Sequence, residues 1–193
     1  ERKARWCWPL VVASALRGPA CPPRGSARVR APAMCAESFF GERLGAMPTD
    51  PETALLQMRA AIGAALADGE RRLCVDVQTP ELQASTRGFD AELLARFALA
   101  AADSLASASA PTDDEPLLLM HTMSAALRAQ LLLREGINAD RVRLTCPSWG
   151  NAGGAPSSPL VIVGPDHEAE SDESRQSRER ALSAGTPLIL LNW

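Results

Sequence analysis

The sequence predicts an α/β fold, in which a mostly parallel sheet is flanked by helices in a Rossmann-like arrangement. Its 193 residues are 46% hydrophobic and 22% charged, as is typical of one globular domain of ordinary size. From residue 48 onward, short apolar runs of strand length alternate with longer segments that have helical periodicity. Strands separated by helices require crossover connections, which indicate a parallel sheet covered on both faces.

The first expected element is a helix that begins at Asp50–Pro51 and ends at Asp68–Gly69. Asp50 can accept hydrogen bonds from free amide groups at the helix start, and proline fits the first turn. Leu55, Met58, Ile62 and Leu66 then fall on one face. The alternating segment 72–78 predicts a strand that ends at Thr79–Pro80. The second helix is marked by apolar residues at helical spacing, namely Phe89, Leu93, Phe97, Ala101 and Leu105.

The second half of the chain repeats the alternation of strand and helix. Unbroken apolarity predicts that residues 160–163 form a strand buried on both faces. The other expected elements are a strand at 117–120, a helix at 122–135 ended by Gly136, a strand at 142–146, a loop at 147–159, a helix towards the end of 166–180, and a strand at 187–191. Because the chain stops on an apolar run, 188–193, we expect that the domain is truncated there.

Residues 1–36 differ from the rest in charge. They hold seven basic residues and one acid, a net charge of +6, whereas residues 37–193 hold 13 basic and 22 acidic residues, a net charge of −9. A basic start, an apolar run at 6–13 and an A-x-A site at 13–15 are the parts of a secretory signal peptide. The arginine-rich, acid-free stretch that follows is typical of a plastid transit peptide.

This order predicts a bipartite presequence at 1–36, a linker at 37–47 and a single α/β domain at 48–193. The arrangement resembles the presequences of algae with secondary plastids. A disordered leader, or translated sequence upstream of the true start, is the alternative interpretation. An arm for nucleic-acid binding is disfavoured, because prolines separate the arginines and few aromatic residues lie near them.

Composition and cysteine spacing exclude several chemistries. The only lysine is Lys3, so the body can support neither a P-loop kinase nor a Schiff-base enzyme. No C-x-x-C pair exists for a zinc ribbon or a thioredoxin-type site. Three of the five cysteines lie in the presumed presequence. We expect that the other two, Cys74 and Cys146, are small buried apolar side chains.

A glycine-rich loop after the strand at 142–146 is one candidate ligand site. It contains Gly150, Asn151, Gly153 and Gly154, and backbone amide groups of this kind can hold a phosphate when they converge at a helix start. A strand rather than a helix follows the loop, so an ordinary hairpin loop is the favoured interpretation.

The second candidate site lies after two other strands. His121 and His167 each come shortly after a predicted strand, and Asp166 is next to His167. Two histidines and a carboxylate can hold a metal ion, and Asp166 is also a candidate ligand-binding residue. The spacing does not require a site, and solvated loop histidines are the favoured interpretation. The residues therefore assign no catalytic group, no metal and no cofactor.

Several segments stand in an order that is found in a known family. They are the helix from Pro48 to Gly69, Arg71–Val77, Pro80–Leu82, Phe89–Asp90, Val161–Pro165 and Leu188–Asn192. This order resembles domain-of-unknown-function family 1995, a family of plastids and cyanobacteria that includes assembly proteins of the low-photosystem-II-accumulation type. The resemblance covers residues 48–192, where an Asn follows the last apolar run as it usually does in the family. The family provides no catalytic motif, so no residue here inherits a role.

The resemblance implies a plastid protein of the stroma or thylakoid surface that supports photosystem II assembly. Its expected partners are proteins, namely photosystem II subunits or assembly factors, with peripheral thylakoid contact, no transmembrane segment and no nucleic acid. The alternative hypothesis is an enzyme or sensor that binds a nucleotide or another phosphorylated ligand at the carboxyl ends of the strands.

Overall fold

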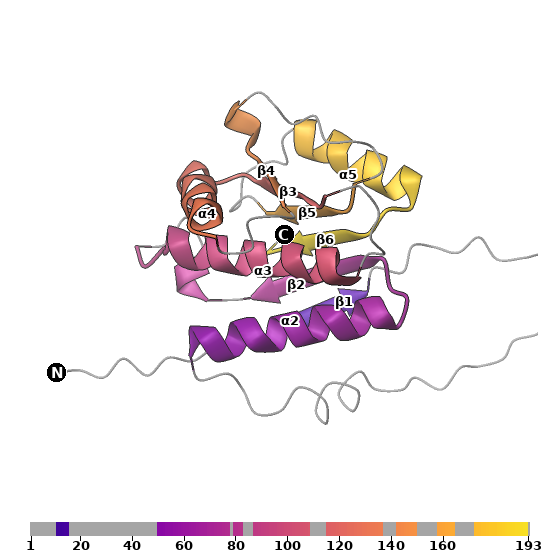
Figure 1. The fold of residues 1–193 in the computed structure, drawn as a ribbon, viewed down its shortest axis with the longest axis horizontal. Helices are drawn as coiled ribbons and strands as arrows, with labels where there is room; N and C mark the ends of the chain where they lie inside the picture. Colours follow the sequence, from indigo (N-terminus) through magenta and orange to yellow (C-terminus); the bar gives the residue numbers. More distant parts are fainter. Residues whose placement is uncertain are drawn as a thin grey trace, which may run out of the picture.

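The computed structural model describes residues 11–15, 50–77, 79–82, 87–108, 115–136, 142–149, 158–164 and 172–192. They form one sheet with helices packed on both of its faces (Figure 1). The strands are β1 (Val11–Ala15), β2 (Arg72–Val77), β3 (Leu117–Met120), β4 (Arg143–Thr145), β5 (Leu160–Val163) and β6 (Leu188–Leu191). The helices are α2 (Pro51–Ala67), α3 (Ala91–Ala108), α4 (Met123–Arg134) and α5 (Asp172–Ala184), with 3-10 turns η1 (Pro80–Leu82) and η2 (Pro147–Trp149).

The sheet has the strand order β1-β2-β6-β5-β3-β4. The five strands from β2 to β4 are all parallel to their neighbours, and β1 is antiparallel to β2 at one edge. Parallel neighbours need crossover connections, which α3, α4 and α5 supply. The predicted α/β class with a mostly parallel, Rossmann-like sheet is confirmed.

Two apolar clusters, one on each face of the sheet, form the core. Helices α2, α3 and α4 build the larger cluster with one face, whereas Ala181 of α5 belongs to the smaller cluster on the other face (Figure 1). Strand β3 divides its residues between them, because Leu118 and Met120 join the larger cluster and Leu117 and Leu119 the smaller one. Burial of both faces explains why β3, β5 and β6 are unbroken apolar runs.

Helix α2 begins and ends as its sequence predicts. The Asp50 carboxylate accepts a hydrogen bond of 2.8 Å from the backbone N–H of Thr53, and Pro51 occupies the first turn. Met58 and Ile62 are fully buried beneath the helix. The helix is followed by Gly69, whose φ of +86° is a left-handed conformation that favours glycine.

Strand β1 falls inside the segment expected to be a presequence. Its residues pair antiparallel with β2, so that Val11 lies opposite Val77 and Ala15 opposite Leu73. Without β1, the backbone groups of β2 would be unpaired at the edge of the sheet, and an apolar, valine-containing segment can pair with them. The remainder of residues 1–49 lies outside the described residues, and the presequence stays a prediction.

The hairpin expected between β4 and β5 is not formed. Both strands are parallel to β3 and lie on opposite sides of it. The two strands are therefore not partners of each other, whereas the strands of a hairpin pair with each other in antiparallel. The hairpin prediction was wrong because sequence spacing does not reveal which strands become neighbours. Of this connection, the structure describes residues 146–149 and 158–159.

Candidate functional site

The carboxyl ends of β3 and β5 form the place in this sheet where a ligand site is expected. The two strands are neighbours, but the helices that follow them lie on opposite faces: α4 packs with the larger cluster and α5 with the smaller one. In open α/β sheets, ligands bind where successive connections diverge in this way, because the divergence opens a crevice beyond the strand ends. The topology therefore favours a ligand site at this edge of the sheet.

A histidine and a serine meet at this divergence point. His121 directly follows β3 and is half-buried, and its Nε2 lies 2.6 Å from the hydroxyl oxygen of Ser174. Ser174 is in the first turn of α5 and is completely buried. The pair therefore joins the end of β3 to the start of α5.

Asn192 connects two other strands, β6 and β2, at the same edge of the sheet. Its side-chain oxygen accepts a hydrogen bond of 2.7 Å from the backbone N–H of Val77, and its backbone N–H donates a hydrogen bond to the backbone carbonyl of Val75. The residue has a φ of +48°, a left-handed conformation that asparagine tolerates better than most residues. Asn192 thus ties the end of β6 to the end of β2.

Two buried oxygen atoms after β2 have no hydrogen-bond partner. They are the hydroxyl of Thr79, which is 2% exposed, and Oε2 of Glu81 in η1. An unsatisfied buried polar group of this kind costs about 1–3 kcal/mol. The hollow between α2 and α3 described below is not lined by either residue.

The candidate residues from the sequence are only partly visible. The structure places His121 beside Ser174, and among the described residues no three groups that could bind a metal ion lie together. Gly150, Asn151, Gly153, Gly154, Asp166 and His167 lie outside the described residues. Ser174 and Asn192 were not expected, because their partners are distant in sequence and share no motif with them.

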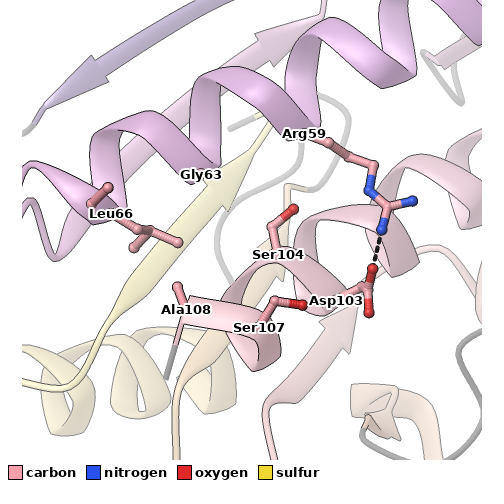
Figure 2. Close-up of a pocket in the computed structure, with 8 residues that line it drawn as sticks. Arg59, Gly63, Leu66, Asp103, Ser104, Ser107 and Ala108 are labelled. Carbon is pink, nitrogen blue, oxygen red and sulfur yellow. Dashed lines mark hydrogen bonds and ion pairs between the residues drawn. The ribbon is translucent and has the colours of Figure 1, made fainter. Parts of the chain in front are cut away.

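A solvent-facing hollow of about 500 Å³ lies between α2 and α3. Figure 2 shows Arg59 reaching from α2 towards Asp103 on α3, with which it forms an ion pair. Gly63 and the serines Ser104 and Ser107 create the space, because their side chains are small. The two lining charges neutralise each other, so the hollow offers no net charge that would attract an ionic ligand.

The cysteines of the body differ in burial. Cys146 is fully buried, as expected, whereas Cys74 on β2 is only half-buried. Burial raises the pKa of the Cys74 thiol, and the carboxylate of Asp76 raises that pKa further. A thiol with a raised pKa carries little thiolate at neutral pH, so Cys74 is a poor nucleophile.

An exposed apolar surface runs along α4. Met123, Leu127 and Leu131, here called the α4 stripe, occupy positions i, i+4 and i+8 and are 38%, 48% and 45% exposed. The indole N–H of Trp149 in η2 contacts the sulfur of Met123 at 3.1 Å. The buried face of the helix is formed by Ala125, Ala126, Ala129 and Leu132. Since α4 is apolar on both faces, its sequence alone does not show which face is covered.

Comparison with known proteins gives no match: no protein-family model, no curated protein and no solved structure matches this chain. Within the described residues, no helix is long and apolar enough to cross a membrane.

Proposed function

We propose that this chain is a non-catalytic plastid protein that supports the assembly or accumulation of photosystem II by binding a protein partner. The observation that carries the proposal is the resemblance of residues 48–192 to domain-of-unknown-function family 1995. The basic, acid-free leader at 17–36 supports the plastid location, either in the stroma or at the thylakoid surface.

Two features of the body support binding over catalysis. The serine of the His121–Ser174 pair is inaccessible, and the Cys74 thiol has a raised pKa. In contrast, α4 presents three large apolar side chains to solvent, a feature typical of protein-binding surfaces. The chain therefore has a surface suited to a partner and, among its described residues, no assembled catalytic group.

Expression of the tagged chain in an alga with a secondary plastid tests this proposal. We expect the full chain in isolated plastids, and we expect it to be enriched with photosystem II subunits or assembly factors after gentle solubilisation of thylakoids. A variant that begins at Glu37 is the matched control and should remain outside the plastid. A full chain that is absent from plastids, or that enriches no thylakoid component, would contradict the proposal.

Binding of a nucleotide or another phosphorylated ligand is the second candidate function. It is favoured by the divergence of α4 and α5 at the ends of β3 and β5. A ligand at about one hundred times its Kd stabilises the native state by about 2.7 kcal/mol. A panel of nucleotides at millimolar concentration should therefore raise the melting temperature if this function is correct, and an unchanged melting temperature would exclude micromolar binding.

A further inference from the structure

We propose that the α4 stripe, together with Trp149, is the docking surface for an acidic amphipathic helix of a partner protein. The inference deepens the proposed function and rests on it only in the premise that the chain acts by binding a protein. It adds the surface that is used and the chemistry of the segment that occupies it.

The α4 stripe is long enough to contact a second helix. Met123 and Leu131 are eight residues apart, which is about 12 Å along a helix at 1.5 Å per residue. Three of the four large apolar side chains that are exposed in the described residues belong to this stripe. Scattered exposure of single residues is ordinary, but a concentration of this kind on one helix marks a binding surface.

Trp149 supplies an aromatic anchor at one end of the stripe. It is half-buried against the larger core cluster, and its indole N–H is held by the sulfur of Met123 at 3.1 Å. A side chain fixed in this way loses little conformational freedom when a partner covers it. Tryptophan is also among the residues that contribute most to binding at interface centres.

The charges on α4 indicate an acidic partner. The helix contains two arginines, Arg128 and Arg134, and no acidic residue, and the exposed Glu135 follows it as its C-cap. Both arginines are exposed, and within the described residues neither is ion-paired. Residues 37–193 carry a net charge of −9, so this helix is a local positive site on an acidic body. Carboxylates beside an apolar face would complement it.

The same charges disfavour two other occupants. In a symmetric antiparallel pair of α4 helices that meet through the stripe, the two copies of Arg128, which lies near the middle of the stripe, would come close together and repel one another. An anionic membrane would attract the arginines but repel the acidic body as a whole. An acidic, amphipathic protein segment complements the local charge of α4 and, because it is short, meets less of the acidic body than a membrane surface would.

Three synthetic helical peptides of about 18 residues test the inference against the full chain. All carry the same leucines at i, i+4, i+7 and i+11, and their flanking positions are glutamate, glutamine or lysine. Fluorescence anisotropy should show that the glutamate peptide binds at least about tenfold more tightly than the lysine peptide. That preference should shrink at about 0.5 M NaCl, because salt screens exposed charges.

Variants at exposed positions locate the binding surface. Leu127→Ser combined with Leu131→Ser should weaken binding of the glutamate peptide by about tenfold or more. Leu56→Ser on α2 is the matched control, because Leu56 is also an exposed leucine of a helix but lies outside the stripe. Arg128→Gln with Arg134→Gln should remove most of the preference for glutamate over lysine. Circular dichroism should be the same for all variants.

Several results would overturn the proposal. The proposal fails if the three peptides bind with the same affinity, or if no binding is measurable at about 100 µM protein. It also fails if Leu56→Ser weakens binding of the glutamate peptide as much as the stripe variant does. Stripe-dependent dimerisation in sedimentation experiments, or stripe-dependent binding to vesicles of anionic lipid without peptide binding, would replace it with the other occupants. If the glutamate peptide binds as expected but the chain enriches no photosystem II component, only the proposed function fails.

Discussion

Hydrogen bonds between residues distant in sequence hold the carboxyl edge of the sheet together. His121 and Ser174 are 53 positions apart, and Val77 and Asn192 are 115 positions apart. Histidine, serine and asparagine are common in loops and at helix ends, and none of these residues belongs to a motif that indicates its partner. The sequence therefore placed His121 after a strand and favoured a solvated loop histidine there, with a metal site as the weaker alternative, but it did not indicate Ser174 as a partner.

Replacement of Ser174 by alanine tests the contribution of this contact. Ser174→Ala should lower the free energy of unfolding by about 1 kcal/mol, because His121 loses a buried hydrogen-bond partner. Ser183→Ala in the same helix is the control, since the Ser183 hydroxyl is exposed and bonds only to a carbonyl of its own helix. Urea denaturation measures both. Equal effects of the two substitutions would show that the His121 contact contributes nothing.

Cys74 should react slowly with alkylating reagents. Its pKa is raised above the ordinary value of 9.0, so the thiolate fraction, and with it the rate, should be small at neutral pH and should keep rising with pH up to and beyond that value. Asp76→Asn removes a negative charge that raises this pKa, and it should speed alkylation at pH 8 by roughly twofold or more. Mass spectrometry of peptides after timed alkylation measures the rate at each cysteine.

Cys146 is the internal control for that experiment. It is fully buried, so it should stay unmodified in the folded protein whether residue 76 is aspartate or asparagine. If Asp76→Asn leaves the Cys74 rate unchanged, the carboxylate does not raise the pKa. If both cysteines become reactive, the substitution has loosened the fold.

At the scale of elements, periodicity and end signals predicted most helices and strands within one or two residues. The strands at 117–120 and 160–163 have the predicted bounds, because unbroken apolar runs begin and end sharply there. The helix towards the end of 166–180 begins at Asp172. Its sequence is highly charged, so its apolar periodicity is weak, and only packing of residues such as Ala181 against the sheet indicates where it lies.

Replacement by alanine should change the stability of the protein in opposite directions at Gly63, inside α2, and at Gly69, just after it. Gly69→Ala should destabilise the protein by about 1 kcal/mol, because Gly69 has a φ of +86° that alanine adopts only with strain. Gly63→Ala should stabilise it by about 0.5–1 kcal/mol, because Gly63 is inside the helix and an added methyl group meets nothing within 4 Å. Thermal denaturation of both variants measures the difference, and the same sign for both would contradict this argument.

At the scale of the whole molecule, the role of the first 36 residues can be tested by removing them. Within the described residues, both core clusters are formed by side chains between Ala54 and Leu191. A chain that begins at Glu37 should therefore keep its circular dichroism spectrum and its cooperative unfolding in urea. Its stability should fall by about 1–2 kcal/mol, because the edge of β2 loses its pairing with β1. Failure of this shorter chain to fold would make residues 11–15 part of the domain and would contradict the presequence interpretation.

By itself, the sequence determined the α/β class, because apolar periodicity and capping residues act over a few neighbouring positions and can be seen in the local order of residues. It also determined the charge contrast between the leader and the body. Tertiary structure alone decided the strand order, the placement of β4 and β5 on opposite sides of β3, and the pairing of His121 with Ser174. It likewise decided that Met123, Leu127 and Leu131 face solvent while Leu132 faces the core. These features depend on which distant segments pack together. The packing that forms is the one that buries apolar area over the whole chain, and no single segment contains that information.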